Sequence, residues 1–402
     1  MKLLSVEKAG SADFEANIRL TGTFSRDDGG EFSIWFEVPR KIESDVSVSG
    51  NFWLLCMLVY AVETGESIEL DLPVDSALVE NVKGLLMQWK SWYPHVHDVE
   101  VVAPVSGFRP DDHRARRKVA AFFSGGVDSY FTALRNCPEL VENAVGRVDE
   151  LIYVHGFDIP VSKCDELLKI KRMLESSAER LGRDLIVVRT NLRQPDSNWA
   201  SGWGGLSHGV GLAIVGHLLE RRYETILIGS THPYGQLMPW GSHPVSDPLL
   251  SSSTLAVRHD GAMFNRVEKT KYLTKHPEVI RNLHVCYQES SAENCGVCQK
   301  CVRTMVTLEV LGFKSELAPF NERFSVDHVG KTFLGNKNDE DFFLEIYNEA
   351  IEAGNPVLRK VLGRSINKSR VVRRVIPVID RFKRIPGFWR VGGAVRRRLI
   401  NI

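Results

Sequence analysis

No apolar run in the sequence is long enough to span a membrane. The longest, NFWLLCMLVYAV at residues 51–62, falls well short of the roughly 20 residues that a membrane helix requires. The opening stretch, MKLLSVEKAGS, contains a short apolar patch but not the sustained hydrophobic region of a signal peptide. We therefore expect a soluble, cytoplasmic protein without a transmembrane segment.

Cysteine is also scarce, with seven in 402 residues. This number is too small for a disulfide scaffold, which excludes the class of small secreted folds. Four of the seven nevertheless lie within sixteen residues, at Cys286, Cys295, Cys298 and Cys301. This clustering is typical of a metal site in a protein of a reducing compartment.

The chain has almost no net charge, but its charges are distributed unevenly. The formal net charge is +1. Residues 357–402, here called the basic tail, contain fourteen Lys or Arg and one acid, so they carry about +13 and the remaining residues about −12. The tail also contains Val, Ile, Phe and Trp. Its composition suits binding to a partner protein, a nucleic acid or an anionic membrane, or packing on the chain's own acidic surface.

Residues 1–106 are predicted to form a separate α+β domain. Four short segments have the alternation of half-buried strands, and two longer segments have helical spacing. The strands are expected at residues 16–24, 31–39, 67–73 and 98–104, and the helices at 51–63 and 76–93. The following segment, GFRPDDHRARRK at residues 107–118, is charged and contains Gly and Pro, which predicts a linker.

From residue 119 onward, short apolar segments alternate with longer helical ones. Strands are expected at residues 119–123, 151–156, 184–190, 224–230 and 283–287, with a helix at 163–182. Repeated βα units predict an α/β fold with a doubly wound parallel sheet, in which ligands bind at the carboxyl ends of the strands. We assign this domain to residues 119–318 and a helical extension with the basic tail to residues 319–402.

The segment FFSGGVDSYFTALRN, residues 122–136, places an apolar strand before a Ser-Gly-Gly-x-Asp-Ser turn and a helix. Gly125 and Gly126 allow the backbone to approach oxygen atoms closely, and Ser124 and Ser129 add hydroxyl donors. Backbone N–H groups at a helix amino-terminus attract anions. The segment therefore predicts a phosphate-binding loop, with a tight turn that holds no ligand as the alternative. It lacks the Gly-Lys-Ser/Thr of a Walker A loop.

The four clustered cysteines have the spacing Cys-x8-Cys-x2-Cys-x2-Cys. Four thiolates satisfy a tetrahedral Zn²⁺ ion, and the glycine at position 296 eases the turn between the first close pair. Such a set leaves no open position for a catalytic water, which favours a structural zinc site. An iron–sulfur site and a redox dithiol are the alternatives.

The turn resembles the PP-loop of the adenine nucleotide α-hydrolase superfamily. The residues that carry the resemblance are Ser124, Gly125, Gly126, Val127, Asp128 and Ser129. The resemblance implies that the loop holds the pyrophosphate of ATP while a carbonyl or carboxylate oxygen is adenylated, and that Asp128 helps to order Mg²⁺. Basic side chains must also neutralise the developing charge. Arg266 and Lys269 are the candidates, although a solvated basic helix face fits their spacing equally well.

Together, the loop and the cysteine spacing are similar to the QueC family of 7-cyano-7-deazaguanine synthases from queuosine biosynthesis. The family's Cys-Tyr and Cys-Gly-x-Cys-x-x-Cys zinc motifs match residues 286–287 and 295–301, and the resemblance covers residues 119–305. It implies ATP, Mg²⁺ and Zn²⁺ as cofactors. It also implies a deazapurine substrate, 7-carboxy-7-deazaguanine, which is adenylated and then converted with ammonia through an amide into a nitrile.

The chain also departs from this family. The family's Gly-Tyr-Pro-Asp-Cys-Arg-like substrate segment is absent, and residues 231–261 stand in its approximate place. This segment is rich in Gly, Pro, Ser, Trp and His, which predicts an active-site loop, with a surface excursion as the alternative. Its candidate substrate contacts are Trp240, His243 and Asp247. This departure leaves open whether the substrate is that of the family or a different one.

Two further pairs are candidates for the nucleotide or acceptor pocket. His155 and Gly156 follow a predicted strand, where a histidine that is simply hydrogen bonded is the alternative. Ser207 and His208 lie in a Gly- and Trp-containing helix start, where close helix packing is the simpler interpretation.

The residues outside 119–305 widen the choice of function. The added amino-terminal part and the basic tail resemble the enlarged, QatC-type relatives found in bacterial anti-phage operons. That resemblance implies a protein amine as acceptor instead of ammonia. We thus expect an ATP-dependent C–N ligase. The alternatives are a PP-loop tRNA-modifying enzyme, such as a thiolase that docks RNA through the tail, and a zinc-stabilised nucleotide-binding subunit without turnover.

Overall fold

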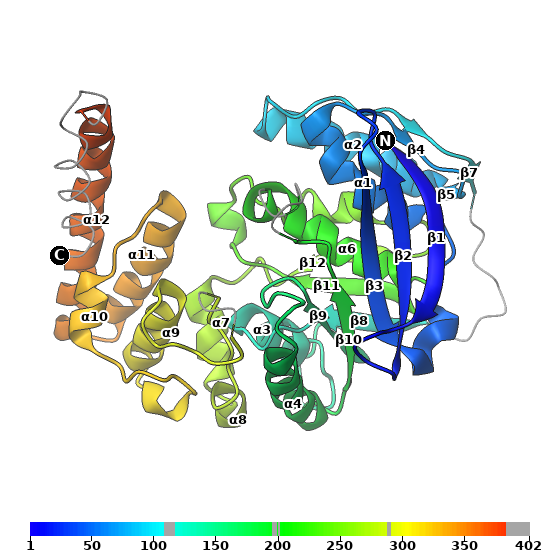
Figure 1. The fold of residues 1–402 in the computed structure, drawn as a ribbon. Coiled ribbons are helices and arrows are strands. Elements are labelled where there is room, and N and C mark those ends of the chain that lie inside the picture. Colours follow the sequence, from blue (N-terminus) through cyan, green and yellow to red (C-terminus); the bar gives the residue numbers. More distant parts are fainter. Residues whose placement is uncertain (108–116, 195–198, 200–201, 288–290, 383–402) are drawn as a thin grey trace. The chain divides into compact units, whose positions relative to one another are not determined.

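The protein was analysed as a computed structural model (Figure 1). The structure describes residues 1–107, 117–194, 199, 202–287 and 291–382. The chain divides into two compact units, Met1–Phe264 and Asn265–Ile402. The expected domain boundary at residues 107–118 therefore lies inside the first unit.

A ten-stranded sheet runs through the first unit, in the order β12-β11-β8-β9-β10-β3-β2-β1-β4-β6. Its strands are β1 (Lys2–Gly10), β2 (Asn17–Ser25), β3 (Glu31–Pro39), β4 (Ile68–Glu69), β6 (Val101–Val102), β8 (Lys118–Phe122), β9 (Glu150–His155), β10 (Asp184–Thr190), β11 (Tyr223–Gly229) and β12 (Ala256–Asp260). Strands β5 (Val74–Asp75) and β7 (Val105–Ser106) form a separate pair. Most neighbours in the large sheet are parallel, which is compatible with a doubly wound α/β fold.

The five strands β8 to β12 are all parallel to their neighbours within this group. Across the sheet, they appear in the chain order third, second, first, fourth and fifth. Helices α3 (Val127–Arg135), α4 (Cys164–Arg180) and α6 (His208–Leu218) lie between them in the chain. The direction of winding reverses between β8 and β11. In open α/β sheets, the carboxyl ends of the strands at such a reversal form the ligand-binding crevice.

The amino-terminal strands extend this parallel sheet instead of forming a domain of their own. Strand β3 pairs antiparallel with β10, and β2 and β1 follow as an antiparallel meander. This pairing covers a sheet edge that would otherwise be open. Helix α1 (Asn51–Thr64) is apolar around its whole circumference and is buried in a core shared with α6 and β11. One sheet and one core therefore join the two expected domains.

Strand and helix predictions from periodicity were largely confirmed. Helices α1 and α2 (Ser76–Trp92) match the predicted pair, and α2 is capped by Asp75, whose carboxylate accepts the N–H groups of Ala77 and Leu78. The strand predicted at residues 283–287 is wrong. The N–H groups of Val285 and Cys286 donate to Oδ1 of Asn294 at 2.8 and 3.1 Å, so these apolar residues form no ladder.

The second unit is helical where it is described. Its helices are α7 (Arg266–Leu273), α8 (Pro277–Ile280), α9 (Gln299–Val310), α10 (Val326–Lys331), α11 (Lys337–Glu352) and α12 (Pro356–Phe382). Their apolar faces form a core that includes Val306, Phe343 and Leu362. The last part of the basic tail, residues 383–402, lies outside the described residues. Within the ranges given above, no helix combines the length and the apolar composition of a membrane-crossing segment.

A buried carboxylate in the first unit gives a testable pH dependence. Burial alone would raise the pKa of Glu150. Hydrogen bonds from Arg222, Lys118 and Tyr223 outweigh it and lower the pKa from 4.5 to about 2. This group therefore stabilises the fold fully above its unfolded pKa, and the contribution is lost as the pH falls from about 4.5 to about 2.

We expect the difference in unfolding free energy between wild type and Glu150→Gln to shrink through this acid window. Urea denaturation followed by tryptophan fluorescence measures it, because seven of the eight tryptophans lie in the first unit. The other carboxylates titrate in both proteins, so their contributions cancel in the difference between the two unfolding free energies. A difference that stays constant as the pH falls through this window would contradict the assignment.

Candidate functional site

The Ser-Gly-Gly-x-Asp-Ser turn lies directly after β8 and opens α3. Gly125 has φ +78°, a left-handed conformation that favours glycine. Gly126 is the N-cap residue, and no side chain caps the helix there. The first-turn N–H groups of a helix have no partner within the helix, so an uncapped first turn suits an anion. Val127 is buried and anchors the turn in the core.

The serines of the turn differ in what they offer. Ser129 is buried, and its hydroxyl donates to the carbonyl oxygen of Gly126 at 3.0 Å. Its proton is thus used inside the loop, whereas both serines were expected to add hydroxyl donors to the phosphate site. Ser124 is only half-buried, as is Asp128 in the first turn of the helix.

The turn sits at the reversal of the sheet. A Cβ atom on Gly229, the last residue of β11, would lie 2.9 Å from the carbonyl oxygen of Asp128 and 3.1 Å from Oγ1 of Thr132. The hydroxyl of Thr132 donates to Oδ2 of Asp260 at 3.0 Å, which ties α3 to the end of β12. The first two turns of α3 therefore pack on the carboxyl ends of β11 and β12, next to β8.

His155 and Gly156 have structural partners. Burial and the neighbouring Arg189 lower the pKa of His155 to about 4, so its ring is neutral at pH 7. Nδ1 of His155 accepts from Nε of Arg189 at 3.4 Å. Gly156 has φ +111°, and a Cβ there would lie 1.9 Å from the carbonyl oxygen of Thr190. This glycine is required by the close approach of the two strand ends.

The segment 231–261 brings Asp247 to the centre of a polar cluster. Oδ2 of Asp247 accepts from Oγ of Ser242 and from Nδ1 of His259, both at 2.7 Å, and Oδ1 accepts the N–H of His243 at 3.1 Å. Asp247 is completely buried. The serine and the histidine contact the same carboxylate oxygen, whereas a nucleophilic triad places the imidazole between the serine and the acid. The arrangement is therefore not that of a nucleophilic triad.

His208, at the start of α6, lies against the same segment. Its Nδ1 contacts the carbonyl oxygen of Trp203 at 3.1 Å, and its ring centroid lies 6.0 Å from that of Trp240. Burial lowers the pKa of His208, although the charge of Asp247 opposes the shift. Because a carbonyl oxygen only accepts, a neutral His208 carries its proton on Nδ1 and keeps Nε2 as an acceptor.

The structure brings together four predicted residues, which are His208, Trp240, His243 and Asp247, with others that the sequence did not single out. We call the group the imidazole–indole cluster. Its members are Trp203, His208, His232, Trp240, Ser242, His243, Asp247 and His259. The ring centroids of His232 and Trp240 lie 5.7 Å apart. Ser207 is different: it is completely buried, and its hydroxyl donates to the carbonyl oxygen of Trp199 at 3.2 Å, so it packs the helix start.

Positive charge borders the cluster. The guanidinium of Arg193, which follows β10, lies 4.6 Å from the ring centroid of Trp203. Arg193 also donates a hydrogen bond of 2.5 Å to the carbonyl oxygen of Phe157. Phe157 lies in the loop after β9. Burial lowers the pKa of Arg193, and the charge of Asp158 opposes that shift. The loops after β9 and β10 thus place a cation beside an indole ring.

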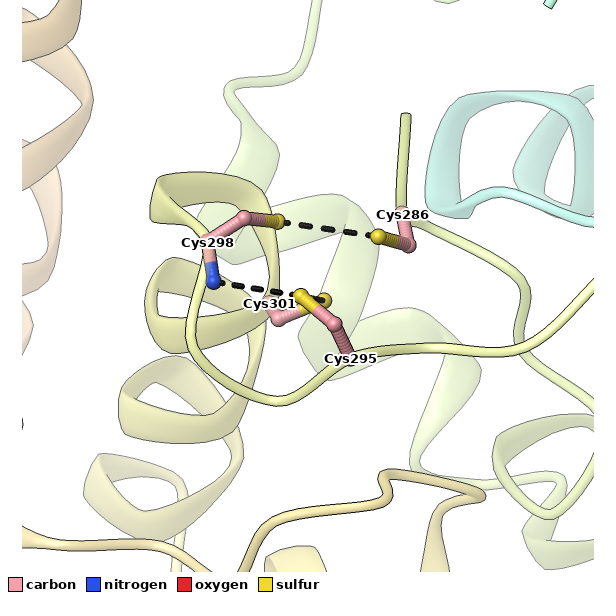
Figure 2. Close-up of side chains that lie close together, drawn as sticks. All are labelled: Cys286, Cys295, Cys298 and Cys301. Carbon is pink, nitrogen blue, oxygen red and sulfur yellow. Dashed lines mark hydrogen bonds between the residues drawn. The ribbon is translucent and has the colours of Figure 1, made fainter. Parts of the chain in front are cut away.

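The four clustered cysteines converge in the second unit (Figure 2). Their sulfur atoms all lie within 4.8 Å of one another. The Cys286–Cys298 and Cys295–Cys301 Sγ pairs are each 3.9 Å apart. A tetrahedral zinc site with Zn–S bonds of about 2.3 Å has sulfur–sulfur edges of about 3.8 Å. The set therefore fits a Cys₄ metal site.

The local backbone supports this arrangement. Cys298 is the N-cap residue of α9, and its N–H donates to Sγ of Cys295 at 3.3 Å. Gly296 has φ +78°, and a Cβ there would lie 2.6 Å from Cβ of Glu322. The glycine therefore permits both the turn between the cysteines and the close passage of a second segment. All four cysteines are largely buried.

Arg266 and Lys269 lie in the second unit, on α7. The helix begins at a capping box in which Asn265 and Glu268 exchange hydrogen bonds. The N–H of Arg266 donates to Oε2 of Glu345 at 3.3 Å. Lys269 is only 1% exposed, so it does not belong to a solvated basic face.

Comparison of the chain with protein-family models, with curated proteins and with solved structures found no match.

Proposed function

We propose that the protein is a PP-loop enzyme that uses ATP to activate a carboxylate, releases pyrophosphate, and transfers the acyl group to an amine. One observation carries this proposal. The uncapped turn at residues 124–129 lies where the winding of the sheet reverses, at the carboxyl end of β8. A ligand that binds there meets glycine backbone and the positive end of α3, as a polyphosphate requires.

The chemistry assigns distinct tasks to the residues of the turn. The N–H groups at Gly126 and Val127 hold the leaving pyrophosphate, and Gly125 gives the backbone the necessary conformation. Mg²⁺, held with the help of Asp128, supplies positive charge that offsets the charge developing on the phosphates. The absence of a Walker lysine fits release of pyrophosphate instead of transfer of the γ-phosphate.

Two substitution steps balance the reaction. First, the substrate carboxylate oxygen attacks the α-phosphorus of ATP, an O–P bond forms, and the bond to the β-phosphate oxygen breaks with loss of pyrophosphate. The amine nitrogen then attacks the acyl carbon, AMP leaves with the electron pair of the C–O bond, and the nitrogen loses a proton to water. We propose a deazapurine acid as substrate and ammonia or a protein amine as acceptor.

We propose the imidazole–indole cluster as the binding site for the ring system of the deazapurine acid. Trp203 and Trp240 offer flat surfaces, and Nε2 of a neutral His208 offers an acceptor for a ring N–H. Arg193 offers a cation for the carboxylate. In this proposal, the Cys₄ site holds Zn²⁺ in a structural role, because its four thiolates leave no open coordination position.

The identity of the nucleotide product tests the proposal. The purified protein is incubated with ATP, Mg²⁺, 7-carboxy-7-deazaguanine and ammonia, and the products are identified by mass spectrometry. We expect AMP, pyrophosphate and the amide of the deazapurine. ADP and inorganic phosphate, or no AMP with ammonia or any protein amine, would contradict the proposal. Parallel reactions with guanine, which lacks the carboxylate, measure any hydrolysis of ATP that occurs without activation of a substrate.

A further inference from the structure

The second unit contains a basic hollow that shares no lining residue with the cysteine cluster. It is lined by residues of α10, α11 and α12 and has a volume of about 750 Å³. Helix α12 packs against both α10 and α11 (Figure 1). Four of its lining residues are cationic and none is acidic. The four are Arg359, Lys360, Arg364 and Lys368.

These four cations differ from the next basic residues of α12 in whether they have an ion-pair partner. Arg370 and Arg373 both pair with Glu340. By contrast, none of the four lining cations forms an ion pair within the part of the chain that the structure describes. The hollow therefore concentrates positive charge that the described residues leave uncompensated.

Lys368 shows the cost of this arrangement. Its Nζ atom is buried and has no hydrogen-bond partner among the described residues. Burial and the neighbouring Lys331 lower the pKa of its ammonium group. A desolvated ammonium without a partner is unfavourable, and an anion bound in the hollow relieves the penalty.

The spacing of the cations indicates which anion fits. Lys360, Arg364 and Lys368 recur every four residues, so they lie along one face of α12 at intervals of about 6 Å. This repeat is close to that of successive phosphates along an extended nucleic-acid strand. Tyr347 also lines the hollow, and Gly363 packs on it: a Cβ there would lie 3.3 Å from the tyrosine ring.

We propose that this hollow binds the backbone of a single nucleic-acid strand, with phosphates on the cations of α12 and a base against Tyr347. A cationic groove combined with an aromatic platform is the usual design of single-strand sites. The inference does not rest on the proposed ATP chemistry.

Binding of a labelled oligonucleotide to the full chain tests this proposal. Fluorescence anisotropy is measured with single-stranded DNA and RNA of the same mixed sequence, about 20 nucleotides long, which exceeds the usual site size. The salt concentration is varied between about 50 and 200 mM. We expect the triple variant Lys360→Gln, Arg364→Gln, Lys368→Gln to bind at least about tenfold more weakly. Its slope of log K against log salt should be smaller by about 2.

A matched variant controls for net charge. Lys275, Lys314 and Arg323 are exposed cations of the same unit that do not line the hollow. Their replacement by Gln removes the same charge, and the basic tail beyond residue 382 is present in both variants. Equal loss in the two variants, or an unchanged triple variant, would overturn the proposal. So would tight binding to phosphatidylserine vesicles without binding to either strand.

Discussion

Removal of the metal from the cysteine cluster is expected to unfold the second unit while the first remains folded. The cluster joins the segment around Cys286 to the start of α9, and α9 contributes Val302, Val306 and Val310 to the core of that unit. Structural zinc sites contribute on the order of 10 kcal/mol to the folding of small metal-dependent domains, which exceeds the usual stability of a domain. Loss of the ion therefore removes more stabilisation than the helices alone replace.

Two optical signals separate the units. A strong chelator, or the variant Cys301→Ser, should lower the far-ultraviolet helical signal. Tryptophan fluorescence should change little, because seven of the eight tryptophans lie in the first unit. Cys164→Ser, a half-buried cysteine of the first unit, is the matched control.

Elemental analysis completes the metal experiment. We expect about one zinc per chain in the wild type and none in Cys301→Ser. Iron in the wild type would replace the zinc assignment with an iron–sulfur cluster. A metal-free Cys301→Ser protein with wild-type helicity and stability would show that the cysteines do not hold the unit together.

Features encoded within short stretches of the chain were predictable from the sequence. The spacing of the four cysteines already indicates that they can hold a metal ion, because a turn and one helix start bring all the thiols together. The turn at residues 124–129 is likewise local. Strands β8 to β11 were located from short apolar segments of the sequence. This prediction is also local, because the apolar pattern of a strand depends on which of its own residues are buried.

Features made by distant pairing were not predictable. The junction of β3 with β10 buries Arg189 against Glu37, a pair separated by 152 residues. No local sequence pattern predicts that these two strands pair. Two separate domains were expected for this reason. In the same way, His259 was overlooked because it lies in β12, inside a segment expected to be a loop, and only the fold carries it to Asp247. Strand β12 is short and mixes polar and apolar residues, so its periodicity is weak.

Substitution of Asp128 is expected to have the largest effect on turnover. Asp128 lies in the first turn of α3, beside the glycines and against the end of β11. In the proposed reaction, its carboxylate helps to hold Mg²⁺ where charge develops on the leaving pyrophosphate. Loss of one such electrostatic contribution commonly lowers kcat by about 10²–10³-fold. We expect Asp128→Ala to lose AMP formation by this factor and to require more Mg²⁺ for the residual rate.

The fold itself supplies a matched control for this variant. Asp165 occupies the equivalent place in the first turn of α4, the helix after β9, and is exposed. Each aspartate interacts with its helix dipole, so each alanine variant should lose about 0.3–1 kcal/mol of stability. Asp165→Ala should keep wild-type turnover and Mg²⁺ dependence, because the winding of the sheet reverses at β8 and not at β9. Equal turnover by the two variants would remove Asp128 from the proposed machinery. A loss confined to Asp128→Ala, with stability matched, would assign the effect to the site and exclude a general weakening of helix starts.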